Sequence, residues 1–219
     1  MLWNIKPNSK VEKVGGKMEK YKLAIGARVR KIRNKRMRKK LKNKPSIISN
    51  HCIGGIISHD LGLKFLSPTV NLKILPDDFI KFVENLKEYL DAEFVEEKSD
   101  LPYPVGKLKD ITVYFVHYKT FQQAVEKWNE RKQRVDFNNI RVMMTARDGA
   151  KYETLKRFNE LPYKKVMFDD VAHPEFDTAI YAHRRNGKPL GNVYISDIIT
   201  ITGKRAFEIN GFDIVEFLN

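Results

Sequence analysis

Hydrophobic and polar residues alternate in blocks along most of the chain, and the spacing within each block predicts a helix or a strand. The clearest strand is 111–116, and further strands are predicted at 140–144 and 165–168. Helices are predicted between them, over 120–134 and around 150–158, where apolar residues recur at helical spacing. Strands that alternate with helices in this way are typical of a parallel sheet with crossover helices.

Shorter signals continue this pattern toward both ends of the chain. Additional strands are predicted at 46–49, 65–75, 179–181 and 213–217, and additional helices over 54–59 and from Pro76 onward. The expected fold is therefore α/β, with a mainly parallel sheet flanked by helices in a Rossmann-like three-layer arrangement.

The amino-terminal region differs from the rest in charge. Residues 1–45 hold 17 of the 41 Lys and Arg residues but only 2 of the 27 Asp and Glu residues. Apolar positions recur at helical spacing over 18–42, and Pro45 ends the predicted helix. We therefore expect a basic helical arm over 1–45 and a nearly neutral α/β domain over 46–219, with a division into two smaller lobes near residue 100.

The basic arm has three open interpretations. In the first, an apolar stripe packs on the body or on a second subunit; the stripe is formed by Tyr21, Ile25, Val29 and Ile32. In the second, residues 18–44 contact an anionic membrane surface. In the third the arm binds nucleic-acid phosphates, which the near-neutral body disfavours.

The composition also limits the compartment. No segment approaches the roughly 18 apolar residues that suggest a membrane span, and the start of the chain lacks the apolar run of a secretion signal. A single cysteine, Cys52, excludes an intramolecular disulfide and is interpreted as a buried structural residue. We expect a cytoplasmic protein, at most peripheral to the inner face of the membrane.

Polar residues follow four of the predicted strands. These are Asn50-His51, His117-Tyr118, Arg147-Asp148 and Asp169-Asp170. The carboxyl ends of parallel strands share one edge of a sheet, so we expect Asn50, His117, Asp148 and Asp169 to surround one site. His117 is the candidate general base and Asp148 the second catalytic candidate. The alternative, that these are ordinary polar loops, stays open.

Two features near these strand ends bear on ligands. Gly54 and Gly55 lie between a strand and a helix, where backbone N–H groups can approach an anion, although neither dinucleotide nor P-loop spacing is present. Asp169, Asp170 and His173 are hard and imidazole ligands for a divalent metal. Metal binding is not favoured, because aspartates after a strand are also common in turns, and no cofactor is identified.

Several ordered motifs together resemble an uncharacterised bacterial family found in capsular and exopolysaccharide biosynthesis clusters. The motifs are 48–55, 67–72, 103–108, 117–118 and 127–129, with Ala124, Arg131 and Arg134. The resemblance covers most of 46–217, and position 53 holds Ile where many relatives have an aromatic residue.

This resemblance implies the handling of activated sugars or lipid-linked glycans, with group transfer among the activities. The candidate ligand-binding residues are Asn50, His51, Gly54, Gly55, Ser67, Asn71, Lys107, Tyr118, Trp128 and Arg131. In the first hypothesis, a transferase, Gly54, Gly55 and Lys107 hold a phosphate, and Asn50, Ser67 and Asn71 contact sugar hydroxyls. The other hypotheses are a non-catalytic accessory protein that binds glycan or nucleotide-sugar and, third, a nucleic-acid-binding protein. A homo-oligomer is compatible with each of them.

Overall fold

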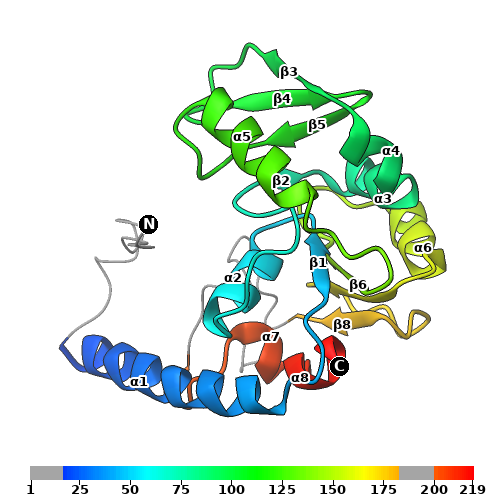
Figure 1. Cartoon of the computed structure of the whole chain (residues 1–219). Helices are drawn as coiled ribbons and strands as arrows, with labels where there is room; N and C mark the ends of the chain where they lie inside the picture. The colour runs from blue at the N-terminus through cyan, green and yellow to red at the C-terminus, as the bar shows by residue number, and fades with distance from the viewer. Residues whose placement is uncertain (1–16, 183–199) are drawn as a thin grey trace.

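A parallel four-stranded sheet forms one half of the body. The structure is a computed structural model that describes residues 17–182 and 200–219 (Figure 1). The sheet has the order β1-β6-β7-β8, from β1 (Ser46–Ser49), β6 (Ile140–Thr145), β7 (Lys164–Asp169) and β8 (Ala179–Tyr181). Every neighbouring pair is parallel, so the carboxyl ends of the strands share one edge, as the sequence predicted.

Helices cover both faces of this sheet and give the expected three layers. One face carries α2 (Ile53–Asp60), α7 (Ala206–Ile209) and α8 (Ile214–Leu218), and the other carries α3 (Pro76–Glu84) and α6 (Tyr152–Glu160). Successive strand residues point to opposite faces: Met143 packs in the core with α2, α7 and α8, while Val142 and Met144 pack in the other core. The α/β fold class is confirmed.

An antiparallel four-stranded sheet forms the other half, and the sequence pattern did not predict it. Its order is β2-β5-β4-β3, from β2 (Lys73–Ile74), β5 (Ile111–Tyr114), β4 (Val105–Leu108) and β3 (Phe94–Glu97). It is inserted between α2 and β6 together with α3, α4 (Leu86–Asp91) and α5 (Phe121–Lys132), and lies above the parallel sheet in Figure 1.

Two predictions are corrected by this second sheet. The clearest predicted strand, over 111–116, contributes β5 to the antiparallel sheet and not a strand of the parallel sheet. Only Lys73 and Ile74 form a strand within the segment 65–75. Residues 98–104, where a division into two lobes was expected near residue 100, connect the paired strands β3 and β4, and the division itself stays a prediction.

The segment 213–217 was predicted as a strand and is a helix. The Asp213 carboxylate accepts hydrogen bonds from the backbone N–H groups of Val215 and Glu216, at 2.8 and 3.0 Å. Such a cap satisfies N–H groups that a helix start leaves free, and it favours α8 over an extended chain.

The basic helix α1 (Lys17–Lys40) packs against the body, but with a different face from the predicted one. Its inward side chain is Arg30, which is 3% exposed and forms ion pairs with Asp60 and Glu208. Tyr21 and Ile32, from the predicted apolar stripe, are 60% and 55% exposed. Packing of this stripe on the body is therefore wrong, and the ion pairs of Arg30, together with Met37 packed against the core around α2, α7 and α8, hold the helix instead.

The long helix does not meet the requirements of a bilayer span. Across the described ranges, no helix has both the length and the apolar character needed to cross a membrane.

Candidate functional site

The carboxyl ends of β1 and β6 are joined by one buried amide. Asn50 donates from Nδ2 to the carbonyl of Thr145 at 3.0 Å and accepts at Oδ1 from the Thr145 N–H at 2.9 Å. Asn50 is fully buried. Because the side chain continues the hydrogen-bond ladder just beyond both strands, it fixes the positions of the residues that follow them.

The residues that follow these two strands form a pair. His51 Nε2 lies 2.9 Å from Asp148 Oδ2; the histidine side chain is 3% exposed and the aspartate side chain is 26% exposed. Asp148 has φ 69° and Gly149 has φ 91°. A positive φ is uncommon outside glycine, although Asp tolerates it better than most residues, and such strain clusters at functional sites.

The charges of this pair follow from its surroundings. Burial lowers the pKa of His51, although the carboxylate of Asp148 opposes the shift. The hydrogen bond from His51 lowers the pKa of Asp148 despite its partial burial. At neutral pH the pair is therefore a neutral imidazole next to an ionised carboxylate, with Nε2 and Oδ2 2.9 Å apart.

Two cations stand beside the pair. Arg147 Nε lies 3.7 Å from Asp148 Oδ2. Lys73 acts on both members of the pair and lowers the pKa of each. It is placed there because Ile74 N–H donates to the carbonyl of Asn50 at 2.9 Å, which attaches β2 to the end of β1. The sequence did not single out Lys73; its interruption of the apolar run between Val70 and Leu75 is the signal that was available.

The neighbouring strand end carries a second, local pair. His173 Nε2 lies 2.7 Å from Asp169 Oδ2 within the loop after β7, and Asp170 N–H donates to the other oxygen of Asp169 at 2.7 Å. Over the part of the chain that the structure describes, no group of three or more His, Cys, Asp or Glu residues could hold a metal ion.

His117 does not follow a strand of the parallel sheet. It follows β5 of the antiparallel sheet and is exposed. Its backbone N–H donates to the carbonyl of Asn71 at 3.3 Å, so it approaches the site only through the loop before β2. Asn71 has φ 66°, and its buried Oδ1 has no hydrogen-bond partner among the described residues.

Tyr118 and Arg131 fix this loop in place. Tyr118 Oη donates to the carbonyl of Val70 at 3.1 Å and accepts from Arg131 Nη1 at 2.7 Å. The Arg131 guanidinium also lies 5.3 Å from the centre of the Phe65 ring. These contacts attach the segment 65–72 to α5 and account for both residues without a ligand.

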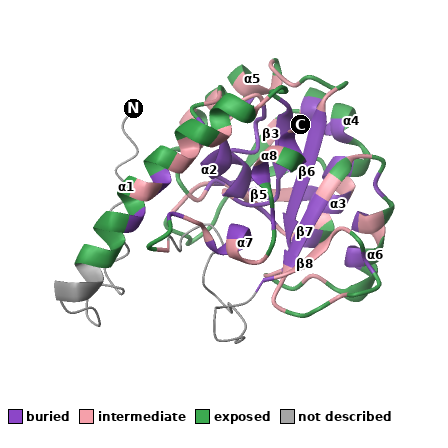
Figure 2. Ribbon diagram, turned by 90° about the horizontal axis from the view of Figure 1, so that it is seen from below, coloured by how far each residue is buried: buried purple, intermediate pink, exposed green. Residues whose placement is uncertain are grey.

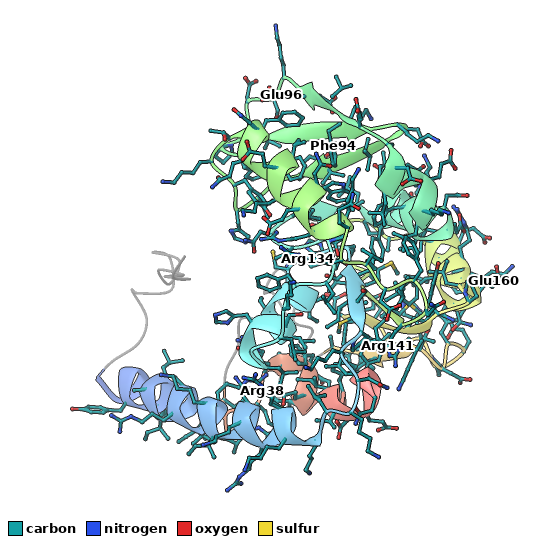
Figure 3. All side chains as sticks on the ribbon, in the orientation of Figure 1. Arg38, Phe94, Glu96, Arg134, Arg141 and Glu160 are labelled. Atoms are coloured by element: carbon teal, nitrogen blue, oxygen red, sulfur yellow. The ribbon has the colours of Figure 1, made fainter. Side chains whose placement is uncertain are left out.

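Trp128 and Lys107 belong to the antiparallel half. Trp128 is 1% exposed, and its ring centre lies 5.0 Å from that of Phe94 and 5.8 Å from that of Phe82, so it is a core residue. Figure 3 labels Phe94 between the sheet and α5, well above the ends of the parallel strands. Lys107 is exposed on β4, where its Nζ lies 2.9 Å from Thr112 Oγ1.

Gly54, Gly55 and Ser67 support the site from below. A Cβ on Gly54 would lie 2.7 Å from Ser49 Oγ, and one on Gly55 would lie 3.2 Å from Val70 Cγ1, so α2 can pack this closely only with glycine there. Ser67 Oγ lies 2.8 Å from Thr69 Oγ1, which accepts from the Ser49 N–H at 3.0 Å. The close contacts explain Gly54 through packing of α2 on β1 and Gly55 through packing of α2 on Val70.

A hollow in the described part of the chain lies away from the strand ends. It has a volume of about 580 Å³ and lies between α1 and the α7–α8 segment. Its lining includes Arg36, Lys40 and Lys204 together with Glu208 and Glu216. The strand ends are therefore chosen as the candidate site for the chemistry of their side chains and not for the size of a cavity.

Comparisons with known proteins identify relatives but add no reaction. A family model described as "Domain of unknown function (DUF1919)" matches residues 25–219. An "Uncharacterized protein" of Haemophilus influenzae is 35% identical over 204 residues, which cover 92% of this chain and 97% of that protein. The family match begins within α1, so it includes the part of the helix that packs on the body.

Proposed function

We propose that this chain, which belongs to the family described as a domain of unknown function (DUF1919), is a group-transfer enzyme. The transferred group is a sugar or a related group carried by a phosphate-bearing donor. The observation that carries the proposal is the His51–Asp148 pair, at 2.9 Å, at the carboxyl edge of the parallel sheet, with Arg147 beside it. Lys73, on the adjoining strand β2, adds positive charge that acts on the pair. A setting in exopolysaccharide synthesis rests on the resemblance of the sequence motifs alone.

Asp148 is the general base in this proposal. A pKa held below its ordinary range keeps the carboxylate ionised at neutral pH, so it accepts a hydrogen bond from an acceptor hydroxyl. The carboxylate takes the hydroxyl proton while the acceptor oxygen bonds to the transferred carbon and the bond from that carbon to the phosphate oxygen breaks. His51 does not touch the substrate; its buried N–H orients the carboxylate.

Arg147 and Lys73 supply the charge for the leaving phosphate. Negative charge grows on the phosphate oxygen as its bond to carbon breaks, and fixed cations stabilise that charge more strongly in the transition state than before it. The Arg147 side chain is 22% exposed, so its planar guanidinium is accessible to a phosphate from solvent. His117 was the predicted general base. In this proposal Asp148 is the base instead, because His117 follows a strand of the other sheet.

A non-catalytic role as a nucleotide-sugar-binding protein is the second candidate. It is favoured by the burial of His51, because only Asp148 of the pair faces solvent and its low pKa makes it a weak base. Both candidates need the same cations for the donor phosphate. Only the transferase should consume a bound donor, and only its activity should depend on the charge of Asp148.

A ligand screen tests the shared part of the proposal. The chain is heated with a panel of nucleotide sugars, with and without Mg²⁺ or Mn²⁺, and a donor that binds the folded state raises the midpoint of unfolding. Arg147→Gln should remove the stabilisation. The matched control is Arg157→Gln, because Arg157 is an exposed arginine that pairs with Glu84 away from the strand ends.

The outcomes separate the candidates. Stabilisation by a donor that disappears in Arg147→Gln and persists in Arg157→Gln supports a phosphate site at the strand ends. Donor consumption with a supplied acceptor then distinguishes transfer from binding. Absence of stabilisation by every nucleotide sugar tested, or equal loss in both arginine variants, would overturn the proposal.

A further inference from the structure

The helix α1 presents an unusual distribution of side chains. Its inward face buries an arginine, Arg30, while Tyr21, Ile25 and Ile32 point outward with exposures of 60%, 46% and 55%. Figure 2 shows most of α1 as exposed, with few buried positions along it. A helix that packs on a core normally does the reverse and buries its apolar stripe.

Contacts between the inward face of α1 and the body fix the orientation of the helix, and they therefore also determine which residues face outward. Arg30 Nε donates to Asp60 Oδ2 at 3.0 Å, and its guanidinium also pairs with Glu208. A Cβ on Gly203 would lie 2.6 Å from the backbone nitrogen of Arg30, which shows how closely the helix backbone meets the body there. At the other end, Asn219 donates to the carbonyl of Lys40 at 3.1 Å.

The outward apolar residues form one stripe bordered by cations. Residues three or four apart lie side by side on a helix, so Arg28 lies between Ile25 and Ile32, and Lys35 and Arg36 follow Ile32. The further exposed cations of the helix are Lys22, Lys31, Arg38, Lys39 and Lys40. Residues 21–44 contain no acidic residue, so no charge within this segment neutralises the face.

We propose that the outward face of α1 binds the surface of an anionic membrane and lies parallel to it. Cations attract anionic headgroups, and the stripe of Tyr21, Ile25 and Ile32 enters the boundary between headgroups and acyl chains. Figure 1 shows the amino-terminal half of α1 reaching beyond the body, which leaves this half accessible to a flat surface. The apolar stripe favours a membrane over nucleic acid, because phosphate binding alone uses cations and gains nothing from exposed isoleucines.

Vesicle binding with two classes of variant tests the proposal. The full chain is sedimented with vesicles of phosphatidylcholine containing about 30% phosphatidylglycerol, which supply the negative surface that cationic segments recognise. The wild type should bind these vesicles and should bind vesicles of pure phosphatidylcholine much more weakly. The double variant Ile25→Ser, Ile32→Ser and the double variant Lys35→Gln, Lys39→Gln should each lower the apparent affinity by about tenfold.

A matched control and a reporter complete the design. Val95→Ser removes an exposed apolar side chain, 69% exposed on β3, and should leave binding unchanged. Tyr21→Trp places an indole fluorophore on the stripe. The emission of this added tryptophan, obtained by subtracting the wild-type spectrum, should move to shorter wavelength on anionic vesicles only. The inference is overturned if the isoleucine variant binds vesicles like the wild type, if the emission of the Tyr21→Trp variant does not move, or if duplex DNA binds more tightly than the vesicles and ignores the isoleucine changes.

Discussion

Two aspartate–histidine pairs stand at the ends of neighbouring parallel strands, and they differ in how they are made. His51 and Asp148 follow β1 and β6, strands that are far apart in the sequence, and their side chains are 2.9 Å apart. His173 lies four residues after Asp169, the last residue of β7, and their side chains are 2.7 Å apart. The fold must assemble the first pair, whereas a single loop is sufficient for the second.

The surroundings of the two pairs differ more than their distances. The first pair includes a residue with positive φ, Asp148, and has Arg147 and Lys73 as cationic neighbours. In the second, Asp169 also accepts the N–H of Asp170 at 2.7 Å, which is the role of an aspartate that forms a turn. Closeness of Asp and His is common to both pairs; the positive φ, the more exposed aspartate and the neighbouring arginine of the first pair are what favour it in the proposal.

The largest expected effect comes from removing the charge of each aspartate in turn. Asp148→Asn should lower donor turnover by about 10²–10⁴-fold, the usual contribution of a general base. Asparagine also tolerates positive φ, so the backbone should keep its conformation. Asp169→Asn, at the end of the next strand, should leave turnover close to that of the wild type.

Circular dichroism and thermal melts establish that both variants are folded before turnover is compared. Equal losses of turnover in the two variants would mean that the pairs are not functionally different. The assignment of Asp148 as base would then fail.

The next effect concerns the joint that holds the first pair together. Asn50→Ala leaves the buried N–H and carbonyl of Thr145 without their partner and should lower the free energy of unfolding by about 2–4 kcal/mol. Urea denaturation measures this loss. Asn138→Ala, at an exposed asparagine, is the control and should change stability by less than about 0.5 kcal/mol. A small effect at Asn50 would show that β1 and β6 do not need this amide.

The pH dependence of stability tests the burial of His51 in the first pair. Because the folded-state pKa of His51 is lowered, the unfolded chain binds the proton first as pH falls below the ordinary histidine value of about 6.5. Stability is therefore full above that pH and decreases as the pH falls through the range where free histidine titrates. His51→Gln keeps a donor for Asp148 but removes the titration, so its stability should fall less between about pH 7 and about pH 5.5.

His173→Gln is the comparison for this measurement, since it changes the local pair. Thermal melts at each pH follow both variants alongside the wild type. If His51→Gln shows the same acid-induced loss as the wild type, burial of a neutral His51 does not contribute to the pH response.

Much of the parallel half could be predicted from periodicity. Strands β1, β6 and β7 have continuous buried runs, and the helices between them show apolar residues at helical spacing. These features made the shared carboxyl edge predictable, and with it the placement of the residues that follow β1 and β6. Local sequence was sufficient here because each element carries its own apolar pattern.

The antiparallel half was missed because two of its strands, β3 and β4, lack such a pattern, and β2 has only two residues. β3 reads Phe-Val-Glu-Glu and is mostly exposed, and β4 contains Gly106. The turn between β4 and β5 uses Lys109, with φ 55°, and Asp110, and this pair is not the usual hairpin signal. With the hairpin unseen, 111–116 was assigned to the wrong sheet, and His117 was placed on the wrong edge.

The inward face of α1 could not be predicted for a different reason. Arg30 is buried because Asp60 and Glu208 meet it there, and these partners lie 30 and 178 residues away in the chain. A buried charge is tolerated only when it is paired, and a sequence pattern does not reveal which acids the fold will bring to it. The helix itself was predicted, but the choice of its packed face was set by tertiary contacts.

The smallest expected effect separates backbone strain from function. Gly149, next to Asp148, and Gly211, between α7 and α8, have φ values of 91° and 94°, and no atom lies within 4 Å of a Cβ built on either. Gly149→Ala and Gly211→Ala should therefore each cost only the strain of a left-handed residue, about 1–2 kcal/mol. If the two variants lose similar stability and only Gly149→Ala weakens turnover or donor affinity, the turn after β6 has a functional role beyond its fold. Loss of turnover in both variants would attribute the effect to stability alone, and the distinction between the two strand ends would then rest on the aspartate variants.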